Sequence, residues 1–195
     1  MVNLNWKQSI IWRYSMSLHD NTKQIFADTL TNLLKTIPFN RITVQRITDT
    51  CGASRQSFYY HFKDKYELVT WIYKTDSDRI VNTSPTASWW EIISAILEVM
   101  EQKRSFYVKI FREEGQNNLI DYLVAYDVEL YTRILRERKE VISLDDSLLF
   151  SIEYHSYACV HMTKRWIMQD PHKAPKKYAQ ELLSVMPSNI RELLV

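Results

Sequence analysis

The sequence predicts an all-α protein made of two helical domains. Only 2 of its 195 residues are glycine, while 46% are hydrophobic, which favours helices over a β fold rich in turns. Along most of the chain the apolar residues recur every three or four positions, the spacing of an amphipathic helix. A chain of this length can bury the cores of two small domains. We predict a boundary near residue 81, with an extension at residues 1–19.

Residues 1–19 do not fit the pattern of the rest of the chain. They contain apolar residues such as Trp6 and Trp12 together with Lys7 and Arg13, and they are too polar and too short for a signal peptide. Two interpretations stay open. Either Met16 is the true start, or the segment is an arm that packs on the body or touches DNA.

Residues 20–37 are predicted to form the first helix. Asn21 and Gln24 make a plausible capping pair at its start, and Pro38 ends it. Apolar residues then follow at helical spacing: Phe26, Leu30, Leu33 and Ile37. We expect this helix to pack on the next two.

Residues 43–51 are predicted to form a short second helix that ends in a turn. Thr43 is a good N-cap, and Val44 and Ile47 share one face. Gly52 stands where the C-terminus of a helix favours a left-handed residue.

The third helix is predicted over residues 54–62, with Ser54 as its cap and with Phe58 and Phe62 on its buried side. Its outward side carries an amide, a hydroxyl and two phenols: Gln56, Ser57, Tyr59 and Tyr60. Such groups can hydrogen-bond to base edges or phosphates without a large charge. The three helices together have the pattern of a helix-turn-helix, which places one short helix in the major groove of DNA.

Three residues beside that face can reach the DNA backbone. Arg55 and His61 lie near the border of the buried side, and Lys65 falls in the first turn of the next helix. Asp64 and Glu67 resemble a capping box, so a new helix begins there. It continues to about residue 81.

The remaining chain is also predicted to be helical. Residues 82–88, with Pro85, form the linker, and residues 82–195 form the second domain. The predicted helices are 88–103, 104–113, 119–140, 145–169 and one last helix at 175–194.

Positive charge is concentrated in the first domain. Residues 20–75 hold eight basic and five acidic residues, whereas the chain from residue 79 onward holds 15 basic and 16 acidic residues. Neutralising DNA phosphates requires such an excess, although many solvated helices show as much.

The helix-turn-helix resembles that of the tetracycline-repressor (TetR) family. The resemblance covers about residues 20–78 and rests on Ile42-Thr43, Ile47, Cys51-Gly52-Ala53-Ser54, the run Ser57 to Phe62, and Lys65. It implies a DNA-binding regulator of transcription, a repressor with activation as the alternative, that binds a palindromic operator as a homodimer. We expect base contacts from Gln56, Ser57 and Tyr60, and phosphate contacts from Thr43, Arg55, Tyr59, His61 and Lys65.

The resemblance also implies a dimer formed by the last two helices. Apolar residues spread around most of the circumference of residues 145–169, which fits burial within the subunit and against a second copy. The interface residues expected from this are Ile152, Met162, Trp166, Leu182 and Met186.

A ligand pocket in the second domain is a further implication of the resemblance. Its expected lining is aromatic: Trp89, Tyr107, Phe111, Tyr122, Tyr126 and His155. The alternative is that these are ordinary core residues. His155 and His161 are six apart and so do not share a helix face, which argues against a metal pair; no metal and no cofactor are expected.

The C-terminal half has a weaker likeness of its own. The stretch from Phe150 to Leu182 resembles regulators of dihydroxyacetone kinase operons, in which the signal can arrive through a partner protein instead of a small ligand. This likeness leaves activation as open as repression.

An enzyme is not indicated. The sequence has no glycine-rich phosphate loop, no GxSxG and no HExxH. Cys51 and Cys159 form no disulfide or zinc pattern, and no stretch approaches the length of a membrane span, so we expect a cytoplasmic protein. A helical interaction module without its own DNA specificity is the alternative, against which Tyr59, Tyr60 and Lys65 argue.

Overall fold

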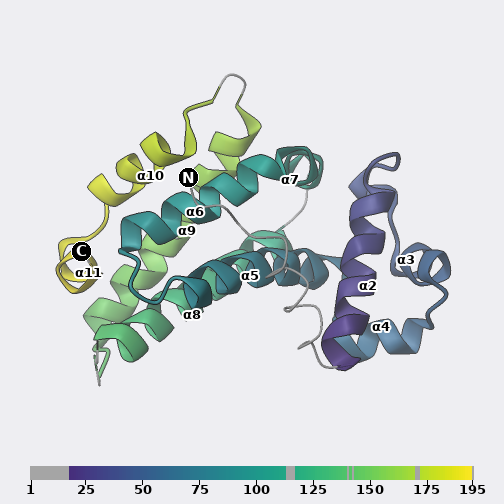
Figure 1. The fold of residues 1–195 in the computed structure, drawn as a ribbon, viewed down its shortest axis with the longest axis horizontal. Coiled ribbons are helices and arrows are strands. Elements are labelled where there is room, and N and C mark those ends of the chain that lie inside the picture. Colours follow the sequence, from purple (N-terminus) through teal and green to yellow (C-terminus); the bar gives the residue numbers. More distant parts are fainter. Residues whose placement is uncertain (1–17, 113–116, 140, 142, 170–171, 195) are drawn as a thin grey trace. The chain divides into compact units, whose positions relative to one another are not determined.

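The computed structural model describes residues 18–112, 117–139, 141, 143–169 and 172–194 (Figure 1). These residues form ten α-helices and one short 3-10 helix, and no strand occurs among them. The predicted all-α class is therefore confirmed. Contacts divide the chain into two compact units, with the break after Leu68.

The first unit contains α2 (Leu18–Leu33), the 3-10 helix η1 (Phe39–Arg41), α3 (Val44–Cys51), α4 (Arg55–His61) and the start of α5 (Lys65–Thr83). Its core is made of fully buried apolar side chains on α2, α3 and α4. Phe26 of α2 meets Phe58 edge-on, with 5.2 Å between the ring centroids, and Ile47 is also fully buried. The face of each helix predicted to be buried is thus the one that packs.

The start of α2 differs from the sequence prediction. The helix begins at Leu18, three residues before the predicted cap, and the Gln24 side chain donates to Asp28 Oδ1 at 2.8 Å, four residues further along. The helix ends at Leu33 instead of Ile37, although Pro38 does stand before the next element. The Gln24 side-chain amide, which the predicted cap would have used, is therefore bonded to the residue one turn further along α2.

The second unit contains the rest of α5 and six further helices: α6 (Trp89–Gln102), α7 (Arg104–Phe111), α8 (Asn117–Lys139), α9 (Asp146–Met168), α10 (Pro175–Ser184) and α11 (Ser188–Leu194). α8 packs along α9, α6 packs on α10, and α11 contacts both α8 and α9. Ser88 and Glu91 form a reciprocal capping box at the start of α6, and Asp145 caps α9.

The C-terminal segment is two helices, so the single predicted helix at 175–194 is wrong. Pro187 separates α10 from α11, because proline has no N–H to donate and disfavours helical backbone in the residue before it. α10 is fixed to α9 by Trp166, whose ring stacks on Tyr178 at 5.1 Å and whose Nε1 donates to Lys173 O at 2.8 Å.

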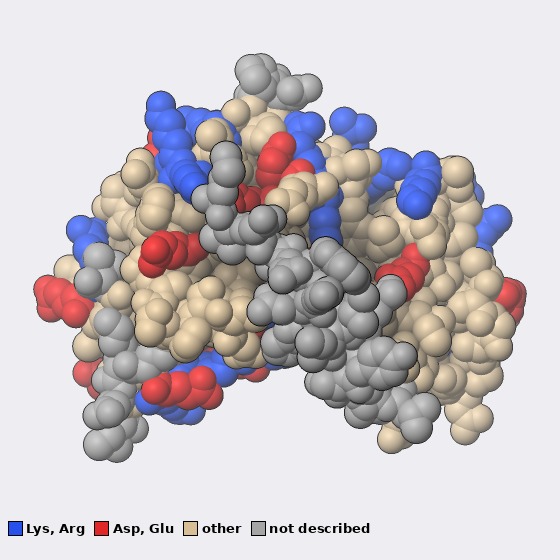
Figure 2. All heavy atoms as spheres, viewed as in Figure 1, with Lys and Arg blue, Asp and Glu red and all other residues tan. Residues whose placement is uncertain are grey.

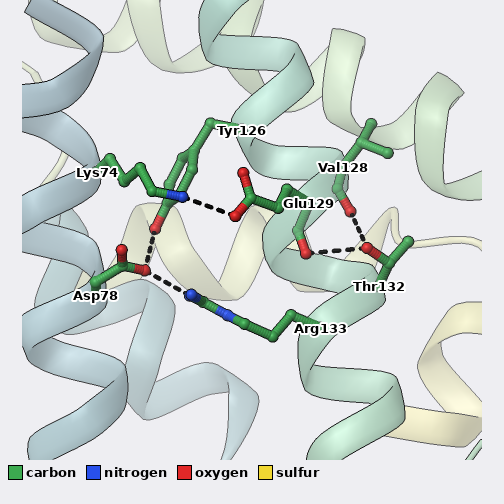
Figure 3. Close-up of polar contacts among 7 residues, drawn as sticks. All are labelled: Lys74, Asp78, Tyr126, Val128, Glu129, Thr132 and Arg133. Atoms are coloured by element: carbon green, nitrogen blue, oxygen red, sulfur yellow. Dashed lines mark hydrogen bonds and ion pairs between the residues drawn. The ribbon is translucent and has the colours of Figure 1, made fainter. Parts of the chain in front are cut away.

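Side-chain pairs join α5 to α8 within the second unit (Figure 3). Asp78 of α5 accepts hydrogen bonds from Arg133 and from Tyr126 Oη, the latter at 3.0 Å. One turn earlier, Lys74 donates to Glu129 at 2.7 Å and lies over the Tyr126 ring, 4.8 Å from its centroid. These contacts pair the charges of α5 and α8 with one another.

Candidate nucleic-acid interface

Three local signals set the angle between α3 and α4. The Thr43 hydroxyl accepts from Arg46 N at 3.1 Å at the start of α3, and the Ser54 hydroxyl accepts from Ser57 N at 3.0 Å at the start of α4. Between them Gly52 adopts φ 70°, the left-handed conformation, and closes α3. Both predicted caps and the predicted turn glycine are therefore confirmed.

Replacing Gly52 with Ala is expected to lower the free energy of unfolding by about 1 kcal/mol, because a Cβ is strained at this positive φ. An added Cβ would meet no described atom within 4 Å, so the cost is that of the backbone alone. Gly52→Asn should cost less, since Asn tolerates the left-handed region. Urea unfolding of the three proteins measures this, and equal stability of Ala and Asn variants would contradict it.

The outward face of α4 is uncharged and strongly exposed. Phe58 is fully buried, whereas Tyr60 is 76% and Tyr59 49% exposed. Gln56 is also exposed, and Ser57 is half-buried. Figure 2 shows mostly uncharged atoms over the part of the surface around α4 that is visible in that view. α4 therefore presents an exposed surface of uncharged polar and aromatic side chains.

Basic groups flank this face on both sides. Arg55 lies beside Tyr59, with its Nη2 3.5 Å from the phenol oxygen and its guanidinium 5.8 Å from the ring centroid. Beyond Thr43, a shallow hollow on α3 is lined partly by Arg41 and Arg46. We did not single out these two arginines from the sequence, although their position beside the N-cap Thr43 was a usable signal.

Lys65 makes its described contacts within the first unit, and the phosphate contact expected of it stays a prediction. Its Nζ donates to Phe39 O at 2.7 Å and to Ile42 O at 2.9 Å, and lies 4.3 Å from the Phe39 ring centroid. The ammonium therefore holds the segment that leads into Thr43. His61 is likewise half-buried and packs on the rings of Phe26 and Tyr60. Both side chains are thus engaged with other residues of the first unit.

Replacing Lys65 with Met is expected to lower the free energy of unfolding by about 2 kcal/mol, because two carbonyls lose a charged donor. The salt dependence of DNA binding should keep its slope if the ammonium stays on the two carbonyls in the complex with DNA. Urea unfolding and binding measured at several salt concentrations test the two parts. If the variant unfolds like the parent and its DNA affinity depends less steeply on salt, Lys65 contacts a phosphate.

The aromatic residues of the second unit line two cavities. Trp89 and His155 contribute to the first, and Tyr107 and Phe111 to the second. Tyr126 instead faces Asp78, as described above. Tyr122 is half-buried and is absent from the described lining of both cavities.

The polar groups in the wall of the first cavity are uncharged at neutral pH, with one exception. Burial lowers the pKa of His155 to about 4 and raises that of Cys159 to about 12, with 3.3 Å between Nε2 and Sγ. Burial also raises the pKa of Tyr131. The exception is the carboxyl of Asp127, whose pKa burial raises to about 7.

α9 carries apolar side chains on two faces, as its sequence predicts. Ile152 and Trp166 face the core and are at most 2% exposed, and Met186 of the following segment is equally buried. Leu182 lines the first cavity. Side chains buried in their own chain have little surface left for a partner, so Ile152, Trp166 and Met186 do not fit the expected interface, whereas Leu182 is half-buried. Met162 is 45% exposed and keeps its place.

The outer face of α9 bears the exposed apolar surface. Phe150 is 70%, Tyr154 66% and Tyr157 43% exposed, and they follow one another at intervals of three and four residues. No helix among the described residues combines the length and hydropathy needed to cross a membrane. The described residues also contain no group of three potential metal ligands.

Two family profiles match the chain. Residues 28–70 match the profile of bacterial regulatory proteins of the tetR family, and residues 87–188, more than half of the chain, match that of a transcriptional regulator C-terminal region. Over 109 residues the chain is 30% identical to the HTH-type dhaKLM operon transcriptional activator DhaS of Lactococcus lactis subsp. lactis (strain IL1403). That match covers 55% of this chain and spans about half, 53%, of the relative.

Solved structures share the fold. A structure of the dihydroxyacetone kinase operon activator DhaS superposes with a TM-score of 0.57 at 20% identity, covering 89% of this chain and 98% of that one. A TetR transcriptional regulator from Streptococcus agalactiae 2603V gives 0.57 at 17% identity, covering 86% and 94%. The helix-turn-helix geometry and the two profile matches lead to one conclusion: the chain belongs to the TetR family of transcriptional regulators.

Proposed function

We propose that the protein binds a palindromic DNA operator as a homodimer and regulates transcription there. The observation that carries the proposal is the exposed, uncharged face of α4 on a helix-turn-helix whose caps and turn are intact. In this assignment Gln56, Ser57 and Tyr60 read base edges. Helices of this kind enter the major groove and contact bases from one face.

Phosphate contacts are assigned to the groups beside that face. Thr43 and Arg55 are exposed at the starts of α3 and α4, and Tyr59 is paired with Arg55. Arg41 and Arg46 join them from the hollow on α3. Hydroxyl, phenol and guanidinium groups are common donors to phosphate oxygens.

The homodimer is proposed to form through the outer face of α9, defined by Phe150, Tyr154 and Tyr157, with the exposed Met162 beside that face. Exposed apolar side chains at helical spacing favour burial against a twofold-related copy, which presents the same face. A twofold dimer also fits a palindromic site, since two recognition helices about 34 Å apart reach successive major grooves.

Replacing both Phe150 and Tyr154 with Glu is expected to give a monomer, because four carboxylates would then be buried in the twofold interface. Both side chains are at least 66% exposed in one chain, so the fold should persist. Asp121→Asn, an exposed change on α8, is the control. Light scattering measures the mass. A double variant with the mass of the parent, twice that of one chain, would place the interface elsewhere.

The sign of regulation and the signal are also part of the proposal. The L. lactis relative is named an activator, which favours activation of a nearby operon over the repression expected from the family at large. The cavities of the second unit favour a small-molecule effector bound there. A partner protein seated on that unit is the alternative signal.

Selection of duplexes from a random DNA library by the purified protein tests the function without knowledge of the operator. The expected result is an enriched sequence with two symmetric half-sites about one helical turn apart. Absence of any enriched sequence would contradict the proposal and favour an interaction module that lacks DNA specificity.

A further inference from the structure

The carboxyl of Asp127 is an acid inside an apolar, aromatic cavity. Asp127 lies on α8 and lines both cavities of the second unit, and both cavities also share Tyr73, Met100 and Thr163. The two hollows therefore adjoin each other at this carboxyl. Among the described lining residues it is the only carboxyl, and neither lysine nor arginine is present.

This carboxyl has little compensation from the protein. Within the described chain it accepts one hydrogen bond, a long one of 3.3 Å from Tyr73 Oη, and forms no ion pair. A buried carboxylate normally has a cation or several donors beside it. Its burial without them raises its pKa to about 7.

Basic side chains on α5 and α8 form ion pairs with carboxylates other than Asp127. Lys74, which follows Tyr73 in α5, pairs with Glu129, and Arg133 of α8 pairs with Asp78 (Figure 3). The imidazole of His155 in the cavity wall is kept neutral by burial, as its pKa of about 4 indicates. Within the described ranges of the chain, no cation forms an ion pair with Asp127.

A second polar group in the same wall has no partner among the described residues. Tyr107, which lines the second cavity, is 2% exposed, and its Oη makes no hydrogen bond within the described part of the chain. Burial raises the pKa of this phenol, so it stays protonated. It can donate to or accept from a ligand group that enters beside Asp127.

The rest of the lining favours an organic cation with an apolar body. The rings of Trp89 and Tyr131 pack 4.6 Å apart in the first cavity, and Tyr107 stacks on Phe111 at 6.2 Å in the second. Aromatic faces attract organic cations as well as apolar groups. An anion would meet the Asp127 charge with no basic residue among the described lining to offset it; Lys164, whose Nζ lies 5.9 Å from the Phe111 ring centroid, is not part of that lining.

We propose that this cavity binds a small apolar molecule that carries one protonated amine, with the ammonium paired to the Asp127 carboxylate and the apolar part among the surrounding aromatic rings. The Tyr107 hydroxyl is the second polar contact. Tyr73, the donor to Asp127, belongs to α5, so a ligand at the carboxyl acts directly on the contacts of that helix. The regulatory meaning of such binding rests on the proposed function, whereas the binding itself does not.

Isothermal titration with two matched probe series tests the site on the full-length protein at pH 8 without DNA. One series is 2-phenylethylamine, 2-phenylethanol and phenylacetate, and the other is hexylamine, hexanol and hexanoate. Within each series the apolar body stays alike while the head is positive, neutral or negative. Tryptophan fluorescence, to which Trp89 in the cavity wall contributes, gives a second readout.

The variant is Asp127→Asn, which keeps the shape and the acceptor for Tyr73 but removes the charge. Asp121→Asn, exposed on the same helix, is the control. We expect at least one of the amines to bind saturably, its alcohol to bind at least about 30-fold more weakly, and Asp127→Asn alone to weaken the amine by about 30-fold. A thermal scan confirms that the variant is folded.

Three results would each overturn the proposal: an alcohol or carboxylate that binds as tightly as its amine, an amine that binds Asp127→Asn equally well, or no saturable binding of either amine up to about 10 mM. The DNA-binding function is tested by a separate experiment, so the two proposals can fail independently. Amine binding by a protein that selects no duplex would support the site and contradict the DNA-binding role.

Discussion

Replacing Tyr60 with Ala is expected to weaken binding to the selected operator by about 100-fold while leaving the fold intact. The effect is large because a twofold dimer loses the contact in both half-sites, and each lost base contact costs about 1–3 kcal/mol. The fold should persist because the side chain is 76% exposed. Fluorescence anisotropy with labelled duplex gives the affinity, and urea unfolding gives the stability.

Two companion variants make this test specific to α4. Ile25→Ala removes another exposed apolar side chain of the same unit, 51% exposed on α2, and should leave operator binding unchanged. Gln56→Ala should change the preferred base at one symmetric pair of positions without a uniform loss on all sequences. If Tyr60→Ala binds the operator as tightly as the parent protein, α4 is not the recognition helix.

Replacing Asp127 with Asn is expected to raise the free energy of unfolding by about 3 kcal/mol at pH 8. Burial raises the pKa of this carboxyl from 3.8 to about 7, so ionisation favours the unfolded chain, where the carboxylate is solvated. Asn removes that charge, and the remaining cost of burying an amide makes the gain smaller than the shift alone implies. Unfolding by urea at a fixed protein concentration measures the difference.

The pH dependence of this gain has a definite sign. Below about pH 4 the carboxyl is protonated in both states, so the gain disappears; it grows as the pH rises from about 4 to 7 and is constant above. The facing groups do not interfere in that window: the pKa values of Tyr73 and Tyr131 are raised by burial, and that of Cys159 is about 12. His155 titrates near pH 4 but is present in both proteins.

Asp121→Asn on the same helix should show no such gain at any pH, because Asp121 is exposed. A gain for Asp127→Asn that stays equal at pH 8 and pH 4 would mean that the carboxyl is not buried without compensation. A loss of stability at pH 8 would mean that the carboxylate is held by a stronger partner than Tyr73.

The first unit could be predicted from sequence because its signals are local. Thr43, Gly52 and Ser54 each act within four residues of their own position, so cap, turn and cap can be recognised without the fold. The spacing of Phe58 and Phe62 similarly fixes which face of α4 packs. The outward set that includes Gln56 and Tyr60 then follows from helix geometry.

Long-range contacts were beyond the same reasoning. The position of Lys65 in the sequence suggested DNA, but its ammonium meets carbonyls 23 and 26 residues away, a contact that only the fold reveals. Helical spacing showed that α9 is apolar on two faces without showing which face is inside, so Ile152 and Trp166 were assigned outward. Asp127 went unnoticed because an acid on a helix is normally solvated.

Sequence-specific DNA binding is the central claim, and its most direct measurement compares two duplexes. Affinity for the selected operator and for a scrambled duplex of the same composition would be measured from low to high salt. We expect the operator to be preferred by about 1,000-fold or more near physiological salt, with both affinities falling steeply as salt rises. Equal affinity for the two duplexes at every salt concentration would contradict the claim.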